Sequence, residues 1–296
     1  MKHLRYFEAL ARLGHFGRAA EACSISQPAL SMQIKELEDL IGAPLVERTT
    51  RQIMLTGLGE EFAERAREII RSVDELSDLA RASQHPLLGR LRIGVIPTIA
   101  PYLLPGVITA LQARYPDLDL RPREAVTGKL INDLIEARLD AAIVALPISE
   151  PSLTEVGLFE EEFVLVRPSD EVDLPVPDAT MLREMRLLLL EEGHCFRDQA
   201  LAFCNLSPTA TREMMEGSSL ATLVQMVGAG IGVTLIPEMA LPVETRSADV
   251  VLQRLGTPAP NRSIGMVWRK SSPLSRQLND VADLVRQTAL LQRKAA

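Results

Sequence analysis

The break at Gln84-His85-Pro86 constrains the fold of this chain more than any other feature. Before it, apolar residues recur at every third or fourth position, which is the spacing of helices that bury one face. After it, short apolar runs alternate with helical segments, a pattern typical of α/β folds. Because proline disfavours helix at the residue before it, a long helix should end here. The 296 residues are therefore predicted to form a helical N-terminal part and a larger α/β part.

Composition restricts the class of protein. The chain is 47% hydrophobic and 24% charged, with a net charge of -7, which argues against a generally basic nucleic-acid coat but not against a local binding patch. Three cysteines are too few for a disulfide framework and favour a reducing compartment. The start of the chain lacks the apolar core of a signal peptide, and the uncharged run 93–113 is interrupted by prolines and glycines. We expect a cytoplasmic protein with no membrane partner.

Two helices are predicted over residues 17–23 and 27–40, with the short turn Ser24-Ile25-Ser26 between them. Ser26 is placed to cap the second helix, and Pro28 falls in its first turn. This pattern is a helix-turn-helix, whose second helix reads base edges in the major groove with its N-terminal end. The DNA-contacting residues predicted here are Ser26, Gln27, Pro28, Ala29, Ser31, Met32 and Lys35.

Residues 45–56 predict two short strands around a polar, basic tip, which together form a wing. Arg48, Thr49, Thr50 and Arg51 would contact phosphate or the minor groove. Each piece alone would suit a small helical subdomain with a solvated hairpin, but the combination favours DNA binding. Residues 1–60 carry seven basic and seven acidic side chains, so affinity must come from the placement of charge rather than its amount.

A long helix is predicted from Thr56-Gly57 to about Ser83, with a heptad seam along it. The seam positions, spaced 4-3-4-3-4, are Phe62, Ala66, Ile69, Val73, Leu76 and Ala80. The seam could pack against its own domain, but its regularity favours pairing with a second copy of the chain. A two-fold dimer would present two recognition helices to two DNA half-sites. The predicted domains are a DNA-binding domain (1–58), a dimerisation helix (59–86) and a regulatory domain (87–296).

From Leu88 onward, strands and helices alternate in two series, which predicts parallel α/β sheets with right-handed crossovers. Phe159–Arg167 and Ser263–Arg269 are candidate crossings between two lobes around a cleft. Lobe I is predicted to hold residues 87–161 and 266–296, and lobe II residues 162–265. Thr98, Thr127 and the pair Ser218-Ser219 each precede a helix and are expected to cap it, although ligands also bind at such strand ends.

Cys195 and Cys204 fall at the two ends of one predicted helix. Nine residues of helix rise about 13.5 Å, whereas a disulfide needs Cα atoms roughly 4.4–6.8 Å apart. The thiols could therefore bond only if the helix unwinds. The helix N-terminus, His194 and nearby Arg197 should favour the Cys195 thiolate, with Cys204 as the resolving thiol. Taken alone, such cysteines are more often small buried hydrophobes, and a zinc site would want more ligands than His194 offers nearby.

Several short motifs carry a resemblance to a known family. They are Ser26-Gln27-Pro28-Ala29-Leu30-Ser31, Gln33-Ile34, Leu37-Glu38, Gly42, Leu45-Val46-Glu47-Arg48 and Thr56-Gly57 with Gly59. Through these residues the whole chain resembles the LysR-type transcriptional regulators. The resemblance implies an α/β protein with a winged helix-turn-helix, a dimerising linker helix, and a two-lobed regulatory domain like periplasmic binding proteins. It also implies a homodimer and usually a homotetramer, with promoter DNA and RNA polymerase as partners.

Within that family, Gly193-His194-Cys195-Phe196-Arg197-Asp198-Gln199 followed by Cys204 resembles the members that sense hydrogen peroxide, as does Gly94-Val95-Ile96-Pro97-Thr98. This resemblance implies that Cys195 is the peroxidatic residue and Cys204 its disulfide partner, reset by a cellular thiol reductant. It implies a peroxide pocket, with no cofactor or metal, formed by Thr98, Thr127, His194 and Arg262.

Two other functions stay open at the level of the sequence. The first is a regulator of the same family that binds a small organic ligand in the cleft between the lobes. The second is a cysteine-dependent peroxidase. An enzyme needs neither the helix-turn-helix nor the heptad helix, so the sequence favours a regulator without catalytic activity.

Overall fold

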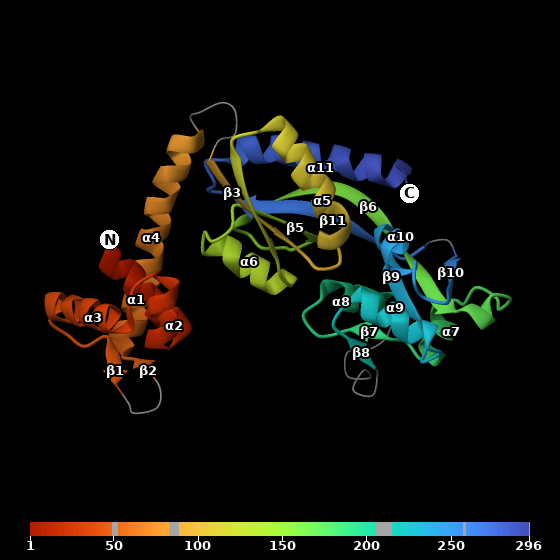
Figure 1. Cartoon of the computed structure of the whole chain (residues 1–296), viewed down its shortest axis with the longest axis horizontal. Helices are drawn as coiled ribbons and strands as arrows, with labels where there is room; N and C mark the ends of the chain where they lie inside the picture. The colour runs from red at the N-terminus through yellow and green to blue at the C-terminus, as the bar shows by residue number, and fades with distance from the viewer. Residues whose placement is uncertain (49–52, 83–88, 205–214, 257–258, 296) are drawn as a thin grey trace. The chain divides into compact units, whose positions relative to one another are not determined.

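The protein is described here by a computed structural model, which covers residues 1–48, 53–82, 89–204, 215–256 and 259–295 (Figure 1). The chain divides into two compact units, residues 1–80 and 81–296. Within the described ranges, no helix has both the length and the apolar character needed to span a bilayer.

The first unit is a winged helix-turn-helix, as predicted. Ser26 caps α3, where its Oγ accepts a hydrogen bond from the Ala29 N–H at 3.4 Å, and Pro28 lies in the first turn. Leu30, Ile34 and Leu37 are buried along one face of α3. The elements are α1 (Lys2–Leu13), α2 (Phe16–Ala22), α3 (Gln27–Ile41), β1 (Val46–Arg48), β2 (Ile53–Leu55) and α4 (Gly57–Ala82).

Hydrogen bonds connect the wing to helices α3 and α4. Glu38 on α3 accepts hydrogen bonds from the backbone N–H groups of Leu45 and Val46, at 2.8 and 3.1 Å. Thr56 donates to the Pro44 carbonyl and accepts from the Gly59 N–H at the start of α4. A Cβ at position 59 would lie 2.0 Å from the Leu45 carbonyl oxygen, so only glycine fits. These contacts explain why Glu38 and Gly59 stand among the apolar residues of this unit.

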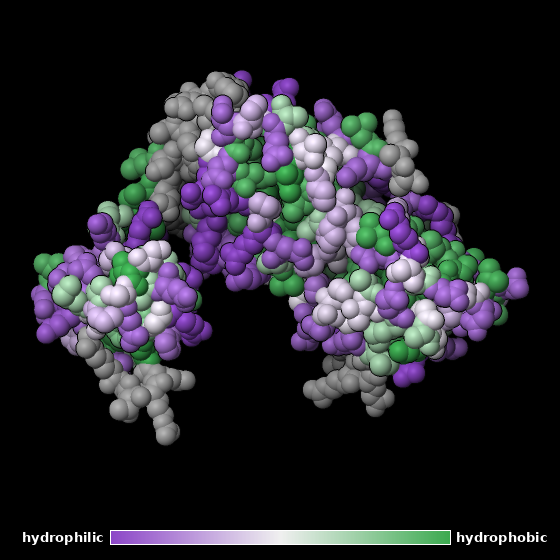
Figure 2. All heavy atoms as spheres, in the orientation of Figure 1, coloured by the Kyte–Doolittle hydropathy of each residue, from purple (hydrophilic) through white to green (hydrophobic). Residues whose placement is uncertain are grey.

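The heptad seam on α4 is used in two ways, a division that the spacing did not predict. Phe62 packs edge-on against Phe7, and Ala66 is buried, so this end of the seam belongs to the core of its own unit. Farther along, Ile69 and Leu76 are 47% and 66% exposed. Apolar side chains show on the surface of α4 in Figure 2. These two seam residues are exposed in the single chain.

The second unit contains two sheets and the helices that cover them. Its strands are β3 (Gly89–Val95), β4 (Leu118–Glu124), β5 (Ala141–Leu146), β6 (Leu153–Pro168), β7 (Leu189–Leu190), β8 (Glu216–Gly217), β9 (Thr234–Pro237), β10 (Val250–Arg254) and β11 (Asn261–Arg269). Its helices are α5 (Ala100–Arg114), α6 (Thr127–Ile135), α7 (Ala179–Glu184), α8 (Cys195–Phe203), α9 (Leu220–Gly228), α10 (Leu241–Glu244), α11 (Ser275–Ala295) and the 3-10 turns η1 (Ser169–Glu171) and η3 (Glu238–Ala240).

The prediction of parallel sheets is confirmed for only some of the strand pairs. In the seven-stranded sheet, ordered β10-β6-β11-β5-β3-β4 with β9 also on β6, only the β3–β4 and β3–β5 pairs are parallel. The pairs that β6 and β11 make are antiparallel, because these strands return across the sheet instead of following a helical crossover. The sequence pattern also predicts a strand over residues 186–191, of which Leu189–Leu190 form β7, in a parallel pair with β8. It predicts another strand over residues 211–216, of which residues 211–214 lie outside the described ranges.

Strand β6 runs through two separate hydrophobic cores and so joins two lobes. Its first part pairs with β11, and its last residues pair with β9 and β10. The first-lobe core is built around β3, α5, β5 and α11, and the second-lobe core around α8, α9 and β9. In Figure 1, α5 and α11 cover the first-lobe sheet, while α8 and α9 stand beside the small second-lobe sheet.

Candidate functional site

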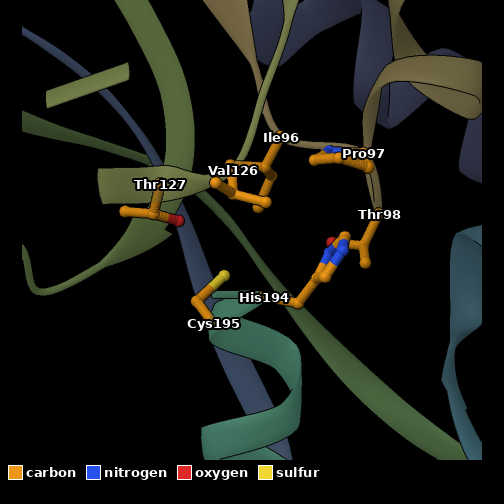
Figure 3. Close-up of a pocket in the computed structure, with 7 residues that line it drawn as sticks. All are labelled: Ile96, Pro97, Thr98, Val126, Thr127, His194 and Cys195. Atoms are coloured by element: carbon orange, nitrogen blue, oxygen red, sulfur yellow. The ribbon is translucent and has the colours of Figure 1, made fainter. Parts of the chain in front are cut away.

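A small hollow lies between the two lobes, where the first-lobe strands end. It is lined by Ile96, Pro97 and Thr98 after β3, Val126 and Thr127 after β4, and His194 and Cys195 at the start of α8 (Figure 3). Its empty space is about 160 Å³, part of it open to solvent. Parallel strands end at a common edge, which is where ligands bind in α/β folds. Four residues named from the sequence therefore meet here: Thr98, Thr127, His194 and Cys195.

Cys195 is the first residue of α8 and stands at the junction of the lobes. It is partly buried and packs against the first-lobe core, whereas the next residue, Phe196, is buried in the second-lobe core. Gly193 precedes it with φ +93°, a left-handed conformation that favours glycine and turns the chain into the helix. In Figure 3 the Cys195 sulfur points into the hollow, toward the side of Thr127.

Thr127 was expected to cap α6, but it does not. The N-cap residue is Val126, and no side chain caps this helix. The Thr127 Oγ is buried, and no group in the described part of the chain hydrogen-bonds to it. The same holds for Oε1 of Gln199, one helical turn beyond Cys195. Buried polar atoms normally have partners, so the Thr127 oxygen, whose residue lines the hollow, marks a place where a polar molecule would be accommodated.

Thr98 likewise does not cap the following helix, because its hydroxyl is used elsewhere. Arg262 donates a hydrogen bond to the Thr98 Oγ at 2.8 Å and another to the Thr98 carbonyl at 3.1 Å. Arg262 itself is 2% exposed and does not line the hollow. It reaches the hollow only through its hydrogen bonds to Thr98. The N-cap prediction holds for Ser219, whose Oγ accepts from the Thr222 N–H.

His194 contributes an imidazole to the wall of the hollow. Burial lowers its pKa below the usual 6.5, while Glu191 and Glu124 act in the opposite direction. The ring is therefore neutral near pH 7 and offers one nitrogen that can accept a hydrogen bond. Because the folded pKa lies below the unfolded one, His194 stabilises the fold at pH values above the unfolded pKa, and this contribution is lost as the pH falls through the folded pKa.

Cys204 lies at the far end of α8, as its C-cap residue, and is fully buried in the second-lobe core. Both Cys195 and Cys204 are present as thiols. Since α8 is a regular helix over its nine residues Cys195–Phe203, the Cα atoms of Cys195 and Cys204 stand roughly 13 Å apart along its axis. Arg197, on the same helix, is buried and donates to the Leu190 carbonyl and to Glu216, which ties α8 to strands β7 and β8.

The predicted DNA-contacting residues of the first unit lie at the start of α3 and on the wing. Gln27, Pro28, Met32 and Lys35 are exposed, Ser26 is the exposed cap, and Ala29 and Ser31 are half-buried. Arg48 ends β1, but its side chain lies outside what the structure describes, as do Thr49, Thr50 and Arg51. Among the residues that the structure describes, no group of three or more His, Cys, Asp or Glu side chains could hold a metal ion.

Comparison with known families decides the class of the protein. Residues 1–60 match the bacterial regulatory helix-turn-helix protein of the lysR family, and residues 84–290 match the LysR substrate binding domain. The chain belongs to the LysR family. It is 42% identical over 294 residues to the probable hydrogen peroxide-inducible genes activator of Streptomyces viridosporus, covering 97% of this chain and 93% of that protein.

Solved structures of this family match both units. Full-length OxyR of Pseudomonas aeruginosa, in a cysteine-to-aspartate form, matches with a TM-score of 0.72 and 36% identity, covering 96% of this chain and 94% of that one. A hydrogen peroxide-bound cysteine-to-serine mutant of Corynebacterium glutamicum OxyR matches with a TM-score of 0.68 and 33% identity, covering 98% and 92%.

Sequence reasoning gave no site role to Glu161, Phe196 and Gln199, although the last two stand in the motif that contains Cys195. Glu161 is buried beside Arg262, and Phe196 lies under the same guanidinium, 5.5 Å from it. Glu161 stands in the acidic run Glu160-Glu161-Glu162, where only the strand register decides which carboxylate faces inward. Gln199 could have been found from its helical spacing of four from Cys195.

Proposed function

We propose that this LysR-family protein is a DNA-binding transcriptional regulator that senses hydrogen peroxide through Cys195. The observation that carries the proposal is the hollow itself. One thiol at a helix start faces a buried hydroxyl that has no partner in the described part of the chain. A small molecule with two hydroxyl groups could supply the missing hydrogen bonds. The peroxide-inducible activator and the peroxide-bound structure among the relatives support the same reading.

In the first step, the Cys195 thiolate attacks one peroxide oxygen. The S–O bond forms as the O–O bond breaks, the sulfur loses two electrons, and the departing hydroxide takes a proton to become water. Thr98 is suited to donate a hydrogen bond to the peroxide, because its Oγ accepts from Arg262 and keeps its own hydrogen available. Thr127 and neutral His194 would complete the polar wall.

In the second step, the Cys204 thiol attacks the sulfenic sulfur of Cys195. The S–S bond forms, the S–OH bond breaks, and the hydroxyl leaves with the Cys204 proton as water. The thiols are too far apart along α8 for this reaction to occur in the helix. The helix must therefore unwind and Cys204 must leave its core, so the disulfide would rebuild the second lobe. A dithiol reductant would reverse the step by thiol–disulfide exchange.

The output of the switch would be DNA binding and transcription. The exposed start of α3 would enter the major groove, with Ser26, Gln27, Pro28, Ala29, Ser31, Met32 and Lys35 near the bases and the wing on the backbone. A homodimer through α4, assembled further into a tetramer, would carry the change in the second lobe to the DNA, where RNA polymerase would be the next partner.

The alternative of an organic ligand between the lobes has less support. The space of about 160 Å³ in the hollow includes volume open to solvent, and the hollow encloses no room for a molecule of that size. The peroxidase alternative differs in requiring steady turnover. Peroxide consumption coupled to a reductant, by protein that does not bind DNA, would support the enzyme instead.

Thiol trapping with mass spectrometry after a brief peroxide pulse tests the proposal. We expect a Cys195–Cys204 disulfide at low peroxide and no promoter activation in Cys195→Ser. Cys23→Ser is the matched control, because Cys23 lies in the first unit, where burial and nearby Glu8 raise its thiol pKa. Absence of the disulfide, or normal activation in Cys195→Ser, would overturn the redox mechanism. A full response in Cys204→Ser would make the sulfenic acid the signal.

A further inference from the structure

Glu161 and Arg262 are cross-strand partners at the junction of the lobes. They stand opposite each other in the antiparallel register of β6 and β11, so their side chains share one face of the sheet. Arg262 Nε donates to Glu161 Oε2 at 2.8 Å, and each residue is only 2% exposed. Burying the charged groups of Glu161 and Arg262 costs desolvation free energy. Two apolar side chains at these positions would avoid that cost.

The guanidinium of Arg262 connects this carboxylate to the hollow on two sides. It donates to the Thr98 hydroxyl and carbonyl, and it lies over the ring of Phe196 at 5.5 Å. Thr98 belongs to the first lobe, whereas Phe196 follows Cys195 in α8. The orientation of one buried cation therefore bears on Thr98, which lines the hollow, and on Phe196, the residue next to Cys195.

The other oxygen of Glu161 is held as firmly as the first. Glu161 Oε1 accepts the backbone N–H of Met239 at 2.8 Å, in the turn η3 that follows β9. Since β9 is itself paired with β6, the sheet positions the backbone that holds Oε1, while the Arg262 side chain holds Oε2. Hydrogen bonds to Arg262 and Met239 therefore hold the Glu161 carboxylate in one orientation.

We propose that Glu161 is a positioning residue for the reaction of Cys195 with hydrogen peroxide, an inference that rests on the proposed function. Its carboxylate fixes the planar guanidinium of Arg262, because a guanidinium holds a carboxylate in a defined geometry. Arg262 occupies a lone pair of the Thr98 oxygen, which directs the Thr98 hydrogen away from Arg262 and toward the peroxide. Glu161 touches neither the peroxide nor the sulfur.

The test compares two reagents for Cys195 in the full-length protein carrying Cys204→Ser. Peroxide needs the aligned Thr98 hydroxyl, whereas iodoacetamide only needs a thiolate. In Glu161→Gln, we expect the peroxide rate constant to fall about tenfold or more and the iodoacetamide rate constant to change less than about threefold. In a Thr98→Val background, Glu161→Gln should change the peroxide rate less than about twofold, because both act through one hydroxyl.

Glu162→Gln is the matched control, since it removes a neighbouring carboxylate on β6 that is paired with exposed Arg254. It should leave both rates unchanged. Equal loss with both reagents, or an additive effect in the Thr98→Val background, would make Glu161 merely structural and overturn the inference. If Glu161→Gln does not fold, Glu161→Asp keeps the charge and should give an intermediate peroxide rate with the same selectivity; an unselective loss would again overturn it. If wild-type Cys195 itself does not react with peroxide, the proposed function fails instead.

Discussion

At the scale of single residues, the two threonines of the hollow differ in what surrounds their hydroxyl groups. Thr98 is held by Arg262, whereas no described group bonds to the Thr127 Oγ. The resemblance to a family named both residues, but nothing in the local sequence separates them, since each simply precedes a helix. The difference arises from β11, which brings Arg262 to Thr98 from 164 positions away along the chain.

Because the Thr127 hydroxyl has no described partner, Thr127→Val should stabilise the fold and yet slow the reaction of Cys195 with peroxide. Thr127→Val removes a buried hydroxyl that has no described partner, so the free energy of unfolding of the reduced protein should rise by about 1 kcal/mol. The same change should slow the reaction of Cys195 with peroxide by about tenfold, because one polar group of the wall is lost. Urea denaturation and rapid-quench trapping of the sulfenic acid measure the two quantities.

Thr109→Val provides the comparison, because the Thr109 hydroxyl is exposed and bonded within α5 to the Pro105 carbonyl. That variant should leave the peroxide rate unchanged. A Thr127→Val protein that unfolds more easily and reacts at the normal rate would show that its hydroxyl stabilises the fold and has no part in the reaction.

At the scale of elements, the sequence predicted those whose signals are local. The cap at Ser26 and the buried face of α3 need only neighbouring residues. The sequence indicated a crossing between the lobes at Phe159–Arg167, but not the full 16-residue strand β6, because its pairing partners come from distant parts of the chain. The placement of Glu161 depends on that register, and so it was missed. The α4 seam was predicted as one unit because periodicity does not reveal which partner each apolar residue meets.

Helix α8 carries the element-scale prediction, since the disulfide requires it to unwind. Ala202 is exposed near the end of this helix, so Ala202→Gly should weaken the helix by up to about 1 kcal/mol without disturbing the cores. We expect the Cys195–Cys204 disulfide to form about threefold faster once the sulfenic acid is present. Formation of the sulfenic acid itself should keep its rate, because Cys195 is at the other end of the helix.

The same substitution on another helix separates a local effect from a general loss of stability. Ala113→Gly lies at the equivalent next-to-last position of α5, also exposed. It should leave both rates as they are. Quenching at successive times, with the two oxidised forms resolved by mass, measures them in one experiment. Disulfide closure at the wild-type rate in Ala202→Gly would contradict unwinding of α8 as the limiting event.

At the scale of the whole molecule, DNA binding must depend on assembly. The first sixty residues hold equal numbers of basic and acidic side chains, and the whole chain is negative by seven charges. One copy of the unit therefore has little general attraction for phosphate, and two copies on one duplex would gain from binding together. The α4 seam offers a surface on which two copies could meet, because its residues Ile69 and Leu76 are exposed in the single chain.

Leu76→Asp tests this dependence without touching a core, because Leu76 is exposed. A charge in the seam should raise the dissociation constant of the dimer by about tenfold or more and weaken DNA binding in parallel. The peroxide rate of Cys195 should stay unchanged. Sedimentation equilibrium and binding to a duplex selected with the wild-type protein measure assembly and affinity. Arg67→Asp, exposed and off the seam, should keep the wild-type oligomer. A Leu76→Asp protein that remains a dimer and binds the duplex normally would remove α4 as the dimer interface.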